Sequence, residues 1–77
     1  MSEVVEVIVR ALVDDPDAVR VTETSRRNGT VYLSISVAPG DTGKVIGRQG
    51  RIANAIRAVA NNIAARDDMR AIVDIDA

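Results

Sequence analysis

The chain has 77 residues, 47% of them hydrophobic and 27% charged, which predicts one small globular domain over residues 1–77 and argues against disorder. It contains no cysteine and no histidine, so disulfides are excluded and the usual zinc ligands and catalytic base are missing. No apolar run approaches the roughly 20 residues that span a bilayer, and Glu3 and Glu6 stand where a signal peptide would carry cations, so we expect a cytoplasmic protein.

The net charge of −1 conceals an uneven distribution along the chain. Residues 1–17 hold five acidic side chains and one arginine, and residues 67–77 hold four acidic side chains and one arginine. Residues 40–57 instead hold four cations and one aspartate. A local basic patch is enough to neutralise a few phosphates, so a polyanionic partner is compatible with this sequence, although one domain alone should bind it weakly.

Residues 2–14 are rich in β-branched side chains, yet their polar residues favour a helix. These residues recur at intervals of three, four and four, at Glu3, Glu6, Arg10 and Asp14. We expect Ser2 to cap this helix, and Asp14-Asp15-Pro16-Asp17 to end it, because the residue before a proline is pushed out of helical geometry. The acidic turn lacks the spacing and the glycine of an EF-hand, so we expect it to be solvated.

A β-hairpin is predicted next. Residues 18–26 and 30–38 both alternate apolar with polar side chains, and the pair Asn28-Gly29 between them is a strong signature of a turn. Val31, Leu33, Ile35 and Val37 should point inward, whereas Arg26 and Arg27 should lie near the tip of the hairpin.

A short helix should follow Pro39-Gly40 and run to Ile46, capped by Asp41 or Thr42. The segment 40–43 has glycines at both ends but no cation between them, so we interpret it as a loop. It does not belong to a Walker A motif either, because Val45 stands where Ser or Thr is required.

The pattern of residues 51–66 predicts a helix more clearly than any other part of the chain, and residues 69–76 are predicted to form a final strand. The apolar residues of the helix follow the i, i+3, i+4, i+7 rule, at Ile52, Ala55, Ile56, Val59, Ala60 and Ile63. The resulting order is α-β-β-α-α-β, an α+β fold. A crossover connection should place the last strand parallel to the second, giving a three-stranded mixed sheet with the helices packed on one face.

One stretch combines glycines with cations: Lys44-Val45-Ile46-Gly47-Arg48-Gln49-Gly50-Arg51-Ile52. Glycines allow a close approach to the backbone, and a helix that starts here adds unpaired N–H groups and the positive end of its dipole. We expect the N–H groups of Gly50 and Arg51 to reach a phosphate, with Lys44, Arg48 and Arg51 supplying charge around it.

This stretch resembles the GxxG signature of KH domains, and the order of elements is that of the bacterial type (type II). A KH domain of this size is similar to the KhpA family of bacterial RNA-binding proteins. The resemblance implies a groove for about four nucleotides of single-stranded RNA or DNA. Within it, Arg48 and Gln49 would touch the sugar–phosphate backbone, and Val45, Ile46 and Ile52 would form the floor under the bases. Arg26 and Arg27 would match the variable loop beside the groove.

The resemblance also implies homodimers and complexes with a larger multidomain KH protein, the KhpB family, acting on transcripts as an RNA chaperone or post-transcriptional regulator. An alternative is a protein-interaction module with little RNA affinity of its own. We do not expect an enzyme, because the sequence presents no convergent catalytic groups. We also expect no cofactor, no bound metal and no membrane partner. For the dimer contact we expect the small and amide side chains on the far side of the 51–66 helix, at Ala58, Asn61, Asn62 and Ala65.

Overall fold

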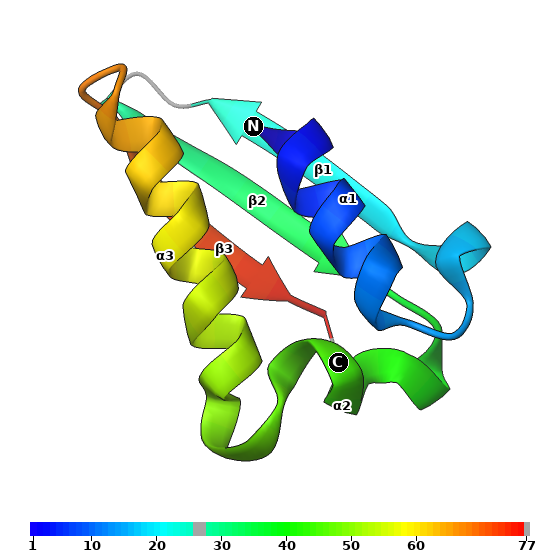
Figure 1. Ribbon diagram of the computed structural model, residues 1–77. Helices are drawn as coiled ribbons and strands as arrows, with labels where there is room; N and C mark the ends of the chain where they lie inside the picture. The colour runs from blue at the N-terminus through cyan, green and yellow to red at the C-terminus, as the bar shows by residue number, and fades with distance from the viewer. Residues whose placement is uncertain (26–27, 77) are drawn as a thin grey trace.

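A computed structural model describes residues 1–25 and 28–76 (Figure 1). Its helices and strands are α1 (Ser2–Leu12), β1 (Arg20–Ser25), β2 (Thr30–Ser36), α2 (Thr42–Ile46), α3 (Arg51–Ala65) and β3 (Arg70–Ile75). Single 3₁₀ turns cover Pro16–Ala18, Pro39–Asp41 and Arg48–Gly50. The expected order α-β-β-α-α-β is confirmed.

The three strands form one mixed sheet in the order β1-β2-β3. β1 pairs with β2 in antiparallel fashion, with Val21 opposite Ile35, and β3 pairs with β2 in parallel, with Val73 opposite Leu33. All three helices lie on the same side of this sheet (Figure 1). The parallel pairing follows from the crossover through α2 and α3, which brings the chain back to the starting end of β2.

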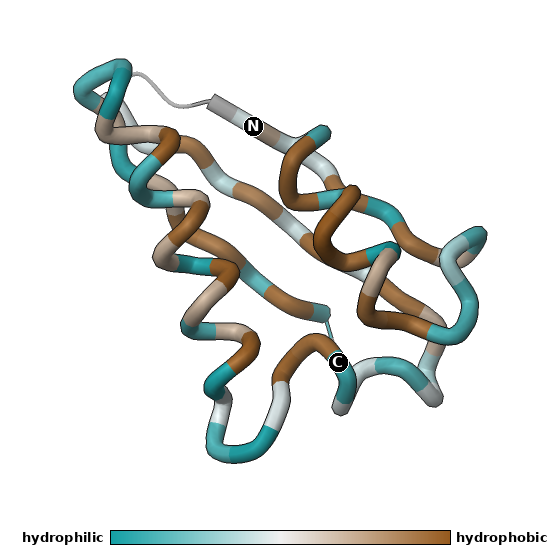
Figure 2. Tube along the Cα trace, in the orientation of Figure 1, coloured by the Kyte–Doolittle hydropathy of each residue, from teal (hydrophilic) through white to brown (hydrophobic). Residues whose placement is uncertain are grey.

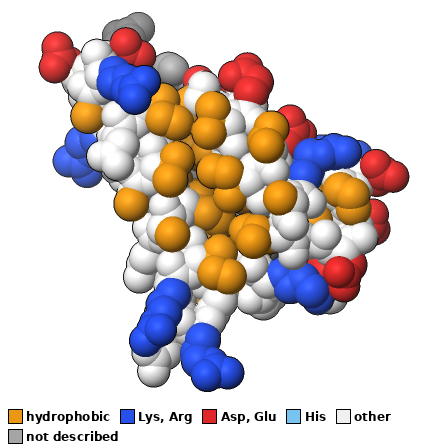
Figure 3. Space-filling view, in the orientation of Figure 1, with side chains coloured by type: hydrophobic (Ala, Val, Ile, Leu, Met, Phe, Trp, Pro, Cys, Tyr) orange, Lys and Arg blue, Asp and Glu red, His pale blue; other side chains and the backbone are white. Residues whose placement is uncertain are grey.

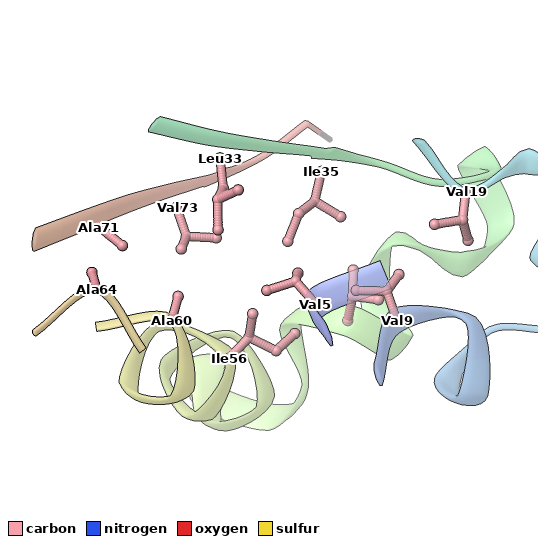
Figure 4. Packing of buried hydrophobic residues seen from close by; sticks show 11 residues of the cluster. Val5, Val9, Val19, Leu33, Ile35, Ile56, Ala60, Ala64, Ala71 and Val73 are labelled. Atoms are coloured by element: carbon pink, nitrogen blue, oxygen red, sulfur yellow. The ribbon is translucent and has the colours of Figure 1, made fainter. Parts of the chain in front are cut away.

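The core lies between the sheet and the helices (Figure 4). Alternate residues of β2 point into it, so that Val31, Leu33 and Ile35 are buried, while Tyr32 and Ser34 are exposed on the other face. The helices contribute small and medium side chains, namely Val5, Val9, Ala53, Ile56, Ala60 and Ala64. Figure 2 shows hydrophobic residues recurring along the helices and strands, with hydrophilic residues between them.

The helix α3 differs from the expectation in which alanines it buries. Ala53 and Ala64 are buried, whereas Ala55, which we expected in the core, is exposed. The reason is that α3 packs with its inner side on β3, so the core-facing stripe is rotated away from Ala55 and toward Ala53. Ala55 therefore faces the space between α3 and α1.

At the start of α1, the prediction that Ser2 caps the helix is wrong. Ser2 is the first helical residue, and Met1 holds the N-cap position without a side-chain bond. The backbone N–H of Ser2 instead donates to the carboxylate of Glu23 on β1, at 2.9 Å. An acceptor from a neighbouring strand thus satisfies one of the unpaired N–H groups of the helix terminus.

The interpretation of residues 40–43 as a loop is also wrong. Gly40 and Asp41 belong to a 3₁₀ turn, and Thr42 and Gly43 begin α2.

Among the described residues, no helix is long and apolar enough to cross a membrane.

The edge strand β3 is held by polar side chains of α3. Asn61 accepts a hydrogen bond from the N–H of Ala71 at 2.9 Å, and the Nε of Arg57 donates to the carbonyl of Val73 at 3.4 Å. Asn61 also donates to the carbonyl of Arg57 at 3.0 Å, and Arg57 Nη1 donates to Asn54 Oδ1 at 3.3 Å. We refer to Asn54, Arg57 and Asn61 as the edge clasp, because Arg57 and Asn61 bind backbone groups of β3 and Asn54 binds the side chain of Arg57.

Candidate nucleic-acid interface

The GxxG loop, residues 47–50, joins α2 to α3 through an unusual backbone. Gly47 has φ +74° and ψ 173°, a region that is essentially restricted to glycine. Gly50 follows at φ +74°, and Gln49 between them is left-handed at φ +57°. A Cβ on Gly47 would lie 2.7 Å from Cγ1 of Ile52, whereas a Cβ on Gly50 would meet no atom within 4 Å. The two glycines therefore serve different purposes: Gly47 permits close packing, and Gly50 permits the turn.

The backbone donors expected from the sequence are bonded inside the loop. The N–H of Gly50 donates to the carbonyl of Gly47 at 3.1 Å, and the N–H of Arg51 donates to that of Arg48. Both groups are therefore bound within the turn in this conformation, and their contact with a phosphate stays a prediction.

Two further donors lie at the tip. Arg48 and Gln49 are the first residues of the 3₁₀ turn, and the opening N–H groups of a helix have no partner within that helix. Arg48 has helical and Gln49 left-handed dihedral angles. A right-handed residue followed by a left-handed one turns successive N–H groups toward the same side, an arrangement known as a nest that binds anions. The backbone at the tip is thus suited to one phosphate oxygen.

Cationic side chains surround this tip. Arg48, Gln49 and Arg51 are all exposed, and Figure 3 shows cations gathered at the end of the molecule where α2 meets α3. The acidic side chains lie elsewhere in this view, beside α1 and at the opposite end. The local field at the loop is therefore positive in spite of the net charge of −1.

Lys44 occupies a different environment from the loop arginines. Its Nζ lies 3.2 Å from a carboxylate oxygen of Asp14 and 3.5 Å from one of Asp41. Asp14, and to a lesser extent Asp41, raise the pKa of Lys44 above its ordinary value. Two carboxylates thus compete with any phosphate for this cation, so Lys44 contributes less to the positive field than its sequence position suggested.

The three apolar residues expected to form the floor of the groove are separated by the fold. Val45 is completely buried and belongs to the core, so its side chain is not available to a ligand. Ile46 is half-buried next to the loop. Ile52 packs against Gly47 and lines the space between α3 and α1. Arg26 and Arg27, the remaining candidates, lie outside the described residues.

An apolar trough between α1 and α3 was not anticipated from the sequence. It encloses about 310 Å³ and is visible in Figure 3 as a band of hydrophobic side chains. Its lining consists of Ile8, Leu12, Arg51, Ile52, Ala55, Ile56 and Val59. The sequence did contain an indication, because α1 carries a second apolar stripe at residues 4, 7, 8 and 11 in addition to the buried Val5 and Val9. One sheet face cannot cover both stripes, and Val4 and Val7 remain 46% and 67% exposed.

The order of elements, the mixed sheet covered by helices on one face and the glycine turn between α2 and α3 together define a KH domain of type II. Comparison with known families agrees, since the model described as "KhpA/KhpB, KH domain" matches residues 2–75. The chain belongs to the KhpA/KhpB KH-domain family, which is non-enzymatic.

Curated relatives cover nearly the whole chain. A protein of Caldanaerobacter subterraneus subsp. tengcongensis named RNA-binding protein KhpA is 48% identical over 75 residues, which are 97% of this chain and 99% of the relative. Proteins of the same name from Streptomyces coelicolor and Aquifex aeolicus are 43% and 40% identical. The former alignment covers 99% of this chain and 95% of the relative, and the latter 97% and 94%.

Proposed function

We propose that this chain binds single-stranded RNA at the GxxG loop, in the cytoplasm, as an RNA chaperone or post-transcriptional regulator. The observation that carries the proposal is the loop tip, where the opening N–H groups of the 3₁₀ turn, those of Arg48 and Gln49, coincide with exposed arginine side chains. A phosphate can accept hydrogen bonds from both kinds of donor at once. Relatives that match almost the full chain are named RNA-binding proteins.

The bases next to the bound phosphate would extend beyond the loop. Ile46 offers them a half-exposed apolar contact, and Arg57 lies two turns further along α3. With a rise of 1.5 Å per residue, Arg57 is about 9 Å from Arg51 along the helix axis, so a strand of a few nucleotides could contact both. The described residues offer few aromatic rings for stacking, since Tyr32 is the one aromatic residue of the chain.

We expect RNA binding to favour single strands over duplexes, because a groove that contacts base edges cannot use bases that are paired. With Lys44 held by two carboxylates, two or three phosphates should be neutralised, which gives a slope of log K against log salt concentration of about −1.4 to −2. Titration of a labelled ten-nucleotide RNA and of its duplex at several salt concentrations measures both quantities. A slope near zero, or tighter binding of the duplex, would contradict the assignment.

We further propose that the protein forms a homodimer through the trough and its rim. One KH groove holds about four nucleotides, and two grooves on one RNA multiply the affinity by roughly 10²–10⁴ through effective concentration. The trough and the exposed Val4 and Val7 form one apolar surface on the helices, which a second copy would remove from water. Ala58 and Asn62 are exposed on α3, the helix that supplies Ile52, Ala55 and Val59 to the trough. Asn61, by contrast, is already bound in the edge clasp, so we no longer place it in the contact.

Ala55→Asp should convert the dimer to a monomer, because it places an unpaired charge in the trough while leaving the monomer's core intact. Asn54→Asp is the control, since it adds the same charge at the preceding, exposed position of the same helix, which does not line the trough. Sedimentation velocity at micromolar concentration distinguishes the two. If the parent protein is monomeric and recovers a larger KH protein from cell extract, the trough serves that partner instead, and if it is monomeric without a partner, the dimer proposal is wrong.

A further inference from the structure

The helix that presents the GxxG loop is too short to hold its own position. α2 has five residues, Thr42–Ile46, whereas isolated helices shorter than about 12 residues are marginal in water. Its orientation must therefore come from tertiary contacts. Since Gly47 follows α2 directly, any shift of α2 also shifts the loop.

One of these contacts is made by a buried carboxylate. Asp41 is 3% exposed and occupies the N-cap position of α2, but its side chain makes no capping bond to that helix. Its Oδ2 instead accepts a hydrogen bond of 3.0 Å from the N–H of Asp15, 26 residues away in the turn after α1. Figure 1 shows this turn beside the segment that enters α2. The carboxylate thus joins the start of α2 to the end of α1.

The contact depends on the charge of Asp41. Burial by itself would raise the pKa of this carboxyl, but hydrogen bonds from the backbone of Asp15 and Asp14 and the proximity of Lys44 outweigh it and lower the pKa below its ordinary value. Lys44, one turn into α2, lies 3.5 Å from Asp41 and 3.2 Å from Asp14. A buried carboxylate is tolerated only when it is paired and hydrogen-bonded. Asp41 therefore requires both the N–H of Asp15 and the ammonium group of Lys44.

We infer that Asp41 is a positioning residue for the RNA-binding loop: its buried carboxylate fixes α2, and with it residues 47–50, against the turn after α1. This inference rests on the proposed function. It explains why Lys44 points toward carboxylates rather than toward the loop. It also assigns a role to the acidic turn of residues 14–17, which the RNA-binding proposal alone leaves unexplained.

Two substitutions separate the components of this contact. Asp41→Ala removes the acceptor of the Asp15 N–H and the partner of Lys44. Asp41→Asn removes the charge and keeps one acceptor oxygen for the Asp15 N–H, while an NH2 group replaces the oxygen that faces Lys44. Val31→Ala is the control for general loss of stability, because Val31 is buried at the end of β2 remote from α2.

The experiment compares the parent and these variants at matched folded fractions in two measurements. Amide hydrogen exchange without RNA reports on the loop, where the N–H groups of Gly50 and Arg51 are bonded to carbonyls of the turn. Affinity for a ten-nucleotide single-stranded RNA reports on function. We expect Asp41→Ala to accelerate exchange at these two amides selectively and to weaken RNA binding by about tenfold, with Asp41→Asn between Asp41→Ala and the parent.

Unchanged loop exchange and RNA affinity in folded Asp41→Ala would overturn the inference, and so would an equal loss of affinity in Val31→Ala. If the parent protein itself does not bind single-stranded RNA, the proposed function is wrong. In that case the exchange measurement still decides whether Asp41 positions the loop, so the two failures are distinguishable.

Discussion

Replacing Arg48 and Gln49 together by aspartate should weaken the binding of single-stranded RNA by about 100-fold while leaving the fold intact. The loss corresponds to about 2.7 kcal/mol, in line with removing a charge-assisted contact and adding repulsion of the phosphate. Both side chains are exposed at the tip of the loop, and neither makes a hydrogen bond to the described residues. The free energy of unfolding should therefore change by only about 0.5 kcal/mol. Fluorescence anisotropy with a labelled RNA measures the affinity, and circular dichroism the fold.

The control for this variant is the pair Arg10→Asp and Thr22→Asp, which changes the net charge by the same amount at exposed sites outside the loop. If binding depended only on the total charge, both double variants would lose affinity equally. RNA binding at the parental level in the folded loop variant would show that the GxxG loop is not the site.

Gly47→Ala should cost about 3 kcal/mol of unfolding free energy, because a positive φ with an extended ψ is open almost only to glycine and because the new side chain overlaps Ile52. The new Cβ would lie 2.7–3.0 Å from three carbon atoms of that side chain. Gly50→Ala is the comparison, because its φ is the same, whereas its ψ of 15° is left-handed helical and its Cβ would enter open space. It should cost about 1–2 kcal/mol, the backbone contribution alone.

Thermal unfolding followed by circular dichroism distinguishes the two glycines. For a domain of this size each kcal/mol lowers Tm by roughly 4–8 °C, so Gly47→Ala should unfold well below Gly50→Ala. Equal losses would mean that Ile52 moves aside at no cost, and that the close packing between the loop and α3 does not constrain residue 47.

The elements of this fold were predictable wherever a local period dominates. The strict alternation in residues 30–38 predicted β2 and the direction of its side chains, and the repeat in residues 51–66 predicted α3. In α1 the spacing of the polar residues was more informative than β propensity, because a helix that covers a sheet must keep one polar face. The turn at the two glycines of the loop was equally predictable, since the positive φ of Gly47 and Gly50 depends on the local backbone alone.

The features that the sequence did not predict all depend on distant partners. The sequence predicts that Lys44 is a free cation, but the fold places Asp14, thirty positions earlier in the chain, beside it. The family resemblance implies that Val45 contacts the ligand, but its side chain is completely buried in the core. The hydrogen bonds that the N–H groups of Gly50 and Arg51 make to carbonyls of the loop also could not be predicted, because they depend on the 3₁₀ turn over Arg48–Gly50. Short-range patterns specify elements, whereas exposure and pairing arise only when the elements are packed.

The edge clasp has a consequence for the behaviour of this protein at high local concentration. An open strand edge is a template on which a strand of another molecule can add, and repeated addition leads toward cross-β fibrils. At β3 the N–H of Ala71 and the carbonyl of Val73 are occupied by Asn61 and Arg57. An incoming strand would have to displace both side chains before it could form its own ladder. At high local concentration these two groups of β3 are therefore not available to seed the pairing of sheets from different molecules.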